Sequence, residues 1–260
     1  MPIQAVDSDR LYRKIARQLS ALIDAGEFMP GQCLPAERAL AQQLGVSRPS
    51  VREALIALEI AGKVVIRVGS GVFVTEQKPP ALLTESQDGV EGEGEGPFEL
   101  LQARKVIEGE TAATAAQEAT PAEVAAIEAA VKEHSQAGAT GAAAADRAFH
   151  LAIAKANHNG PLLGVVQLLW DQGRGAIWKQ MEKHFETPAL RSATLRDHRA
   201  IVDAIAAHDA RGARKVMQAH LGRVAEEFAR GWEPKEEPRK TPPVKRTPKA
   251  RGASAGDASK

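Results

Sequence analysis

Residues 35–55 read PAERALAQQLGVSRPSVREAL, and this stretch decides the fold of the N-terminal part of the chain. Pro35 suits the first turn of a helix because its backbone angle is fixed near the helical value, and Gly45 marks where that helix ends. Ser47 is placed to cap the next helix, whose apolar residues Val51 and Leu55 recur at helical spacing. Two short helices joined by a tight turn predict a helix-turn-helix.

The flanking segments predict a winged helix around this pair. Apolar residues three or four positions apart predict a first helix that begins at Ser8 or Asp9. The β-rich runs 64–68 and 72–75, joined by a turn that contains two glycines, predict a hairpin that forms the wing. We therefore assign residues 1–76 to a winged helix-turn-helix domain.

The remaining chain divides by composition into a linker, a helical domain and a tail. Residues 77–97 carry one basic and five acidic residues among frequent glycines and prolines, which predicts a flexible acidic linker. Residues 231–260 carry eight basic and four acidic residues and too few apolar ones to form a core, which predicts a disordered basic tail. Between them, residues 98–230 show helical periodicity throughout.

The fold class is therefore mostly α, with an N-terminal winged helix-turn-helix and a C-terminal all-α helical bundle. We expect six or seven helices in the bundle, because alanine is abundant and proline or glycine separates the apolar runs. The expected runs are 98–118, 121–137, 142–157, 161–183, 189–207 and 210–230.

Composition narrows the class of protein. The 260 residues are enough for two domains, and a hydrophobic fraction of 43% suits globular cores. Cys33 is the only cysteine, so an internal disulfide is excluded. No apolar stretch long enough for a signal peptide or membrane span precedes Arg10, so we expect a cytoplasmic protein without a membrane partner.

The start of the expected recognition helix has the residue types that DNA binding requires. Arg48 and Arg52 are four residues apart and share a helix face away from the apolar stripe, where an arginine can bond both acceptors of a guanine. Ser47 and Ser50 offer hydroxyl groups to phosphates, and Arg38 lies on the preceding helix. The alternative is that the arginines are solvated surface charges; the adjacent wing favours DNA.

The first 76 residues resemble the winged helix of the GntR family of bacterial transcription regulators. The motif of that family runs from a proline-acidic-arginine start of the second helix, through a serine/threonine-arginine start of the third, to a glycine-bearing wing. Residues 98–230 resemble the all-helical effector domain of its fatty-acid-regulator subfamily, called FCD. The stretches 96–104, 149–154 and 170–178 look closest to regulators of hexuronate catabolism.

The resemblance implies roles for individual DNA-binding residues. It implies that the three arginines contact DNA bases or phosphates and that the two serines contact the DNA backbone. It also implies that Gly69 of the wing enters the minor groove. Pro49 stands where relatives often have a hydroxyl residue, which implies one backbone contact fewer. The implied DNA-binding residues are Arg38, Ser47, Arg48, Ser50, Arg52 and Gly69.

Four residues of the helical domain form a candidate metal site. Asp146 and His150 are four apart on one helix face, and His198 and His220 lie on two later helices that a bundle can bring alongside. Three imidazoles and one carboxylate suit a divalent ion, zinc first, with nickel or manganese as alternatives. The spacing alone is weak evidence, but these positions match the metal-binding Asp and three His of the resembling domains. The other histidines are interpreted as structural or solvated: His134, His158, His184 and His208.

Arg104 is the candidate effector-binding residue. It lies in a segment meant for burial, and a buried arginine needs an anionic partner. That partner is either Glu108, one helical turn later, or the carboxylate of an effector, which the resemblance implies. Asn157 either caps its helix or lines the effector pocket. Trp170 and Trp178 are eight residues apart on one expected helix and therefore share a face. They are interpreted as core or dimer contacts, with ligand contact as the alternative.

These observations predict a ligand-responsive, homodimeric transcription regulator rather than an enzyme. We expect a palindromic double-stranded operator, a small organic acid effector such as a hexuronate or related sugar acid, and repression that the acid relieves. Two alternatives remain open. One is a metal-ion sensor. The other is a metal-dependent hydrolase or isomerase fused to a DNA-binding domain; against it, the sequence shows no well-placed general acid or base beyond the metal ligands.

Overall fold

The computed structural model describes residues 10–75, 96–173 and 175–230. Within these ranges lie ten α-helices and one two-stranded sheet. Most of the expected acidic linker and all of the expected basic tail lie outside the described residues. Among the described helices, none combines the length and apolar character that crossing a membrane requires.

The N-terminal unit is a winged helix, as the sequence predicts. Ser47 caps the third helix, since its Oγ atom accepts a hydrogen bond from the Ser50 amide at 3.3 Å. Gly45 ends the second helix with a positive φ of 65°. The two strands pair antiparallel around the wing turn. The elements are α1 (Leu11–Asp24), α2 (Glu37–Leu44), α3 (Arg48–Ile60), β1 (Val64–Arg67) and β2 (Gly71–Val74).

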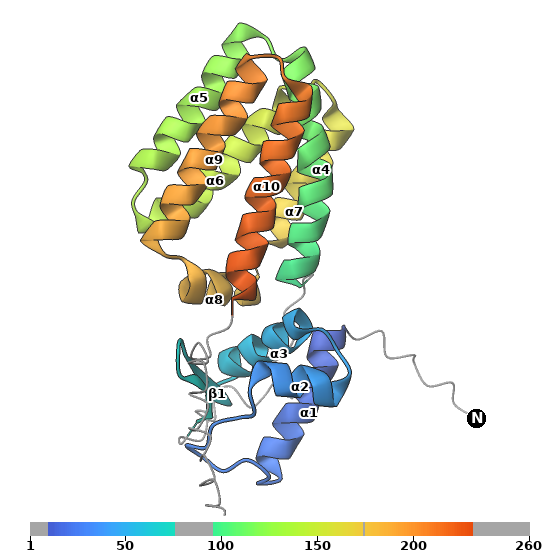
Figure 1. The fold of residues 1–260 in the computed structure, drawn as a ribbon, viewed down its shortest axis with the longest axis vertical. Coiled ribbons are helices and arrows are strands. Elements are labelled where there is room, and N and C mark those ends of the chain that lie inside the picture. Colours follow the sequence, from blue (N-terminus) through green and yellow to red (C-terminus); the bar gives the residue numbers. More distant parts are fainter. Residues whose placement is uncertain (1–9, 76–95, 174, 231–260) are drawn as a thin grey trace, which may run out of the picture.

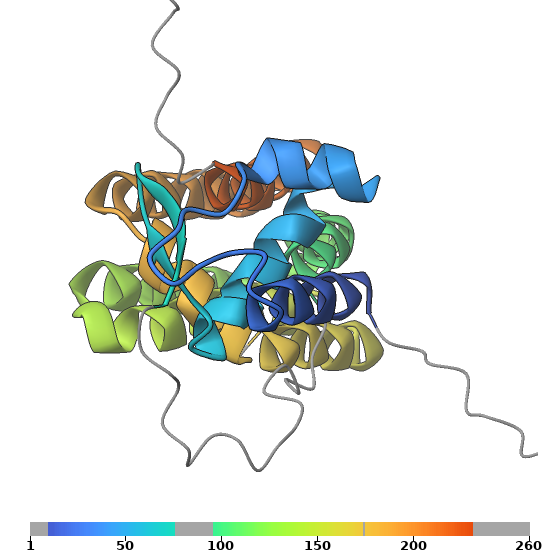
Figure 2. The same ribbon diagram turned by 90° about the horizontal axis from the view of Figure 1, so that it is seen from below.

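Helix α3 is buried on nearly all sides, whereas the sequence predicts a single buried stripe. Every residue from Val51 to Leu58 is buried, including Arg52 and Glu53. One face of α3 packs against α1 and the wing, and the opposite face packs against the helical domain through α8. Figures 1 and 2 show α3 lying directly beneath the bundle. The apolar spacing predicts only the face of α3 that packs within the winged helix, so it underestimates how much of α3 is buried once α8 covers the other face.

The C-terminal unit is a bundle of seven helices. Helix α10 packs along α4 and α9, and α5 packs along α6 and α9 (Figure 1). Gly109 allows the close approach of α4 and α10, because a Cβ atom there would lie 2.8 Å from Gln218 Cγ. The helices are α4 (Pro97–Glu118), α5 (Pro121–Gln136), α6 (Ala139–Lys155), α7 (Gly160–Gln172), α8 (Ala176–Phe185), α9 (Pro188–Ala206) and α10 (Ala210–Ala229).

The expected single helix 161–183 is wrong. It divides into α7 and α8, with Gly173 as the C-cap of α7 and Gly175 as the N-cap of α8. Glycine is a poor helix former, and two glycines so close together interrupt the helix although the apolar periodicity continues. Trp170 and Trp178 therefore lie on different helices and do not share one helix face. Helix α8 closes the end of the bundle that faces α3 (Figure 1).

Candidate metal centre and nucleic-acid interface

The four predicted metal ligands come together inside the bundle. His150 of α6, His198 of α9 and His220 of α10 are buried, and their candidate ligand atoms lie within 4.8 Å of one another. Asp146 Oδ1 lies 3.3 Å from His198 Nε2 and 3.9 Å from His150 Nε2. The helices thus place three imidazoles and one carboxylate around one point.

The residues present fit a divalent ion. Asp146 Oδ1, His150 Nε2 and His198 Nε2 are buried and have no hydrogen-bond partner. Buried polar atoms are nearly always paired, because leaving one unpaired costs about 1–3 kcal/mol. A shared ion would satisfy all three atoms, and three imidazoles with one carboxylate form a donor set that zinc and similar ions prefer.

Carboxylates hold two of these histidines from outside the cluster. His150 Nδ1 forms an ion-pair contact with Glu108 of α4. His220 Nδ1 lies 3.4 Å from Asp197 Oδ2, and Asp197 also pairs with Arg223. Such outer contacts fix the ring orientation and leave the Nε2 atom facing the metal position.

His134 also belongs to this cluster, although the sequence predicts a structural or solvated role for it. Its Nδ1 atom lies 3.4 Å from His198 Nδ1 and 3.6 Å from Asp146 Oδ1. The signal for its burial was present, since Ile127, Val131 and His134 recur on one face of α5 and all three are buried. Nothing local indicated that this face meets α6 and α9.

The electrostatics favour the neutral form of His198 and His220 and the ionised form of Glu108. Burial lowers the pKa of His198 well below its ordinary value, and burial together with the charge of His150 lowers the pKa of His220 to about 3. Burial would raise the pKa of Glu108, but the charges of Arg104 and His150 outweigh it and lower that pKa to about 2. Neutral imidazoles keep the lone pairs that a metal requires.

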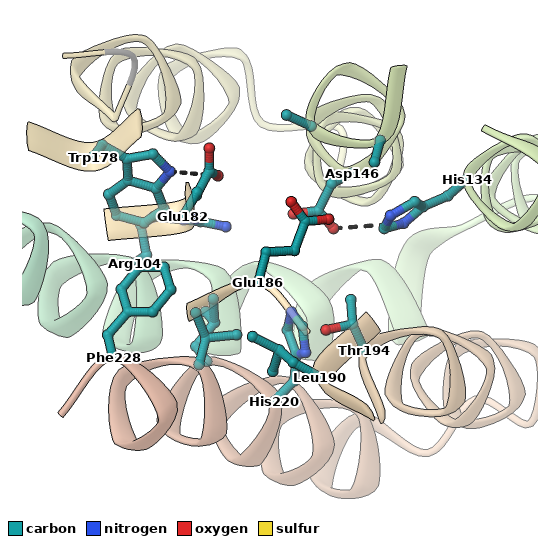
Figure 3. Close-up of a pocket in the computed structure, with 14 residues that line it drawn as sticks. Arg104, His134, Asp146, Trp178, Glu182, Glu186, Leu190, Thr194, His220 and Phe228 are labelled. Atoms are coloured by element: carbon teal, nitrogen blue, oxygen red, sulfur yellow. Dashed lines mark hydrogen bonds and ion pairs between the residues drawn. The ribbon is translucent and has the colours of Figure 1, made fainter. Parts of the chain in front are cut away.

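A cavity of about 160 Å³ adjoins the cluster. Figure 3 shows side chains from α4, α6, α8, α9 and α10 turned toward one space. Trp178 and Phe228 line it near the winged helix, and the candidate metal ligands Asp146 and His220 line it at the cluster. Its polar lining consists of Arg104, His134, Asp146, Glu182, Glu186, Thr194 and His220.

The structure shows the Glu108 pairing of Arg104, and its binding of an effector carboxylate stays a prediction. Its Nε atom donates to Glu108 Oε1 at 2.6 Å, which is the predicted pairing along the helix. Its guanidinium also stacks on Trp170, with Cζ 3.8 Å from the ring centroid, and borders the cavity. The cation is thus pre-oriented and still faces space where an anion fits.

Asn157 is buried but does not line this cavity. Its Oδ1 atom accepts a hydrogen bond from the Asn159 amide at 2.7 Å, in the turn between α6 and α7. The N-cap of α7 is Asn159 itself. The structure therefore gives Asn157 a role in holding the turn, and its contact with an effector stays a prediction.

Most of the predicted DNA-binding residues lie on the accessible side of the winged helix. Arg38 and Ser47 are exposed, and the Arg48 side chain is 48% exposed, with Nε 3.4 Å from Glu37 Oε1. Ser50 Oγ lies 2.8 Å from Ser47 Oγ, at the start of α3. Gly69 forms the tip of the wing turn with φ of 78°. Their contact with DNA stays a prediction.

Arg52 is the exception, and the expectation that it shares an exposed face with Arg48 is wrong in this arrangement. Its side chain is 1% exposed. Its Nη2 atom donates to Glu37 Oε1 at 2.7 Å, and its Nη1 atom donates to the backbone oxygen of Phe228 at 2.5 Å. The reason is that α8 and the end of α10 cover this part of α3, so Arg52 faces protein instead of solvent.

Two glutamates of α3 add further contacts between the domains. Glu59 Oε2 accepts from Gln180 Nε2 at 2.8 Å and lies 2.6 Å from His184 Nε2, both on α8. Glu53 Oε1 accepts from the Phe98 amide at 3.2 Å, and burial raises the pKa of Glu53 to about 7. The recognition helix is thus bonded to α4, α8 and α10.

Comparison with known proteins gives close relatives over most of the chain. It is 35% identical over 225 residues to the Uxu operon transcriptional regulator of Escherichia coli, covering 85% of this chain and 87% of the relative. It is 32% identical over 220 residues to the Exu regulon transcriptional regulator of that organism, covering 84% of each. A third relative, ascribed to regulation of the L-lactate dehydrogenase operon of Escherichia coli, is 37% identical over 219 residues, covering 82% and 84%.

Two families account for the two units of the structure. Bacterial regulatory proteins of the gntR family match residues 11–74, which contain α1–α3 and the wing. The FCD domain family matches residues 99–223, which contain the candidate metal centre and Arg104. The chain belongs to the GntR family of bacterial regulatory proteins, as a DNA-binding transcription regulator with an FCD domain and not as an enzyme.

Proposed function

We propose that this regulator is a homodimeric repressor that binds a palindromic operator and releases it when a small organic acid binds beside a divalent metal ion. The observation that carries the proposal is the set of buried, unpaired ligand atoms next to a cavity bordered by Arg104. A metal position, a cation and a cavity in one place form a binding site for an acid.

Asp146, His150, His198 and His220 would hold the ion, with zinc as the first choice and nickel or manganese as alternatives. The bound ion would supply positive charge and open coordination positions for ligand oxygens. Arg104 would bind the carboxylate of the acid, because its guanidinium faces the cavity and is already oriented by Glu108.

The relatives support a hexuronate or related sugar acid as the effector. The Uxu and Exu regulators belong to hexuronate pathways and align over more than four fifths of this chain. The relative ascribed to the L-lactate dehydrogenase operon is equally similar, so sequence identity alone does not separate a sugar acid from a short hydroxy acid.

Helix α10 offers a route from the acid to the DNA-binding surface. His220 lies at the candidate metal centre, two turns before Phe228, whose ring lines the cavity and whose backbone oxygen accepts from Arg52. We infer that the arrangement with Arg52 buried is the one released from DNA, since Arg52 cannot contact a base while α10 holds it. An acid that binds this arrangement more tightly would shift the population toward it.

An exposed apolar surface supports the homodimer. Val106 of α4 and Val165 and Leu168 of α7 are exposed, and these two helices pack side by side. Burial of such side chains against a second copy is favourable by about 25 cal/mol per Å² of apolar surface. Two recognition helices related by a twofold axis would then bind two operator half-sites.

DNA binding measured in four conditions tests the proposal. The purified protein selects duplexes from a random-sequence pool, and fluorescence anisotropy then gives its affinity with and without zinc and with and without D-glucuronate. We expect the acid to weaken DNA binding of the zinc-loaded protein only. Release of DNA on zinc addition or chelation alone, with no response to acid, would instead support the metal-ion sensor.

A further inference from the structure

Two carboxylates share the proposed acid-binding cavity with the cation that would bind the acid. Glu182 and Glu186 lie one helical turn apart at the end of α8, and both line the cavity beside Arg104 and Trp178. Figure 3 shows Glu182 beside Trp178 and Glu186 in the middle of the space, turned toward Asp146. A pocket built only to bind negative charge would not contain them, because they repel a second anion.

Glu182 is the better placed of the two. It is partly buried, and its Oε1 atom accepts a hydrogen bond from Trp178 Nε1 at 2.7 Å. Within the described parts of the chain, no cation forms an ion pair with Glu182. Burial raises the pKa of Glu182, and this effect outweighs the lowering by the Trp178 hydrogen bond. Among the described residues only Trp178 donates a hydrogen bond to Glu182, so the carboxylate can accept further hydrogen bonds from a ligand.

The donors that complement such a carboxylate are hydroxyl groups. Because Arg104 and Glu182 line the same cavity, a ligand carboxylate bound by Arg104 would leave other carbons of the ligand in the space that Glu182 borders. Hydroxyl groups on those carbons would donate to Glu182, and Trp178 offers an apolar wall for the carbon-bound hydrogens. A second carboxylate in that position would instead meet the charge of Glu182.

We infer that Glu182 is a specificity-determining residue that selects polyhydroxylated monocarboxylic acids over short hydroxy acids and over dicarboxylic acids. The inference rests on the proposed function, and it names the chemical class of acid that the same site takes. Arg104 and the candidate metal position would bind the carboxylate of the ligand, and Glu182 would select for hydroxyl groups on its other carbons.

Calorimetric titration of the full-length, zinc-loaded protein with three acids tests this inference. The acids are D-glucuronate, L-lactate and the dicarboxylic sugar acid galactarate. We expect the wild type to bind D-glucuronate at least tenfold more tightly than either of the others. In Glu182→Gln, which keeps the size of the side chain and an oxygen for Trp178, we expect about tenfold weaker D-glucuronate binding, unchanged L-lactate binding and tighter galactarate binding.

Controls separate this inference from the proposed function. Glu118→Gln, at the exposed end of α4, removes the same charge far from the cavity and should bind all three acids as the wild type does. Thermal unfolding of Glu182→Gln shows whether the variant is folded. Equal weakening of all three acids in Glu182→Gln, or a wild type that prefers L-lactate or galactarate, overturns the role of Glu182 alone. A wild type that binds none of the acids overturns the acid-responsive function and this inference together.

Discussion

Arg48 and Arg52 lie one helical turn apart on α3 but have different surroundings. Arg48 is half exposed at the start of the helix, whereas Arg52 is enclosed between Glu37 and the end of α10. An exposed arginine is free to bond a guanine, but a buried one also stabilises the fold. Substitution of the two residues should therefore have different consequences.

Arg48→Ala should weaken specific DNA binding by about 1–3 kcal/mol and leave the stability of the fold nearly unchanged. Arg52→Ala should also lower the free energy of unfolding, by about 3–5 kcal/mol, because it removes the buried ion pair with Glu37. Anisotropy with a selected duplex and chemical unfolding provide the two values. Equal stability of the two variants would show that the burial of Arg52 is energetically unimportant.

Substitution of histidines inside and beside the candidate metal site should reduce zinc binding to different extents. His198→Ala removes a ligand and should abolish stable zinc binding. His134→Ala removes the contacts to His198 Nδ1 and Asp146 Oδ1 but no predicted ligand, and should lower zinc affinity about 10–100-fold. Zinc content after dialysis against graded chelator concentrations measures both effects, with exposed His208→Ala as the control. Full zinc retention by His198→Ala would contradict the ligand assignment.

Some of these residues were predictable from sequence and others were not. The resemblance identified Asp146, His150, His198 and His220, which the structure brings together. Their helical spacing indicated only that Asp146 and His150 share a face. The burial of Arg52 depends on contact with Phe228, which is 176 residues away, so no local pattern indicates it.

Helices were predictable where caps and periodicity agree. Ser47 caps α3 and Thr120 caps α5 with a capping box, and the structure has both helices where the sequence predicts them. The break between α7 and α8 was missed because the apolar pattern of the segment continues through Gly173 and Gly175. Helix propensity was the better guide at that point than periodicity.

The packing of α3 against α4 should depend on pH. Burial raises the pKa of Glu53 to about 7, so the folded protein binds a proton more tightly than the unfolded chain does. Above pH 7 the charged carboxylate reduces stability, and this effect disappears as the pH falls from about 7 toward 4.5. Glu53→Gln should therefore raise the free energy of unfolding by roughly 1 to 3 kcal/mol at pH 8 and change it little at pH 4.5.

Chemical unfolding of the wild type and Glu53→Gln at a series of pH values measures this difference. Glu118→Gln, an exposed residue of α4, serves as the matched control and should show no such pH dependence. A Glu53→Gln variant that is less stable than the wild type at pH 8 would mean that the carboxylate is stabilised, not penalised, by its buried position.

At the scale of the whole molecule, the two units were predictable but their docking was not. Composition and helix signals locate a winged helix and a bundle. The contacts between them join residues of α3 to residues 45 to 176 positions later, including Phe98, His184 and Phe228. Such contacts depend on the shape of both folded units, and single-sequence patterns carry no information about that shape.

The exposed apolar surface of α4 and α7 leads to a prediction about assembly. Leu168→Asp should convert a dimer into a monomer, because the charge would be buried without a partner at the interface. Sedimentation velocity measures the change. Met29→Asp, at an exposed apolar residue outside the bundle, is the control and should stay dimeric. A dimeric Leu168→Asp variant would place the interface elsewhere.

In the proposed function, the cavity beside Arg104 and the DNA-binding surface are coupled through the bundle, and coupled sites must affect each other equally. The most direct test is calorimetric titration of the zinc-loaded protein with D-glucuronate, once alone and once saturated with a selected DNA duplex. We expect DNA to weaken acid binding by the same factor, at least fivefold, by which the acid weakens DNA binding. An acid affinity that is unchanged by DNA would contradict it.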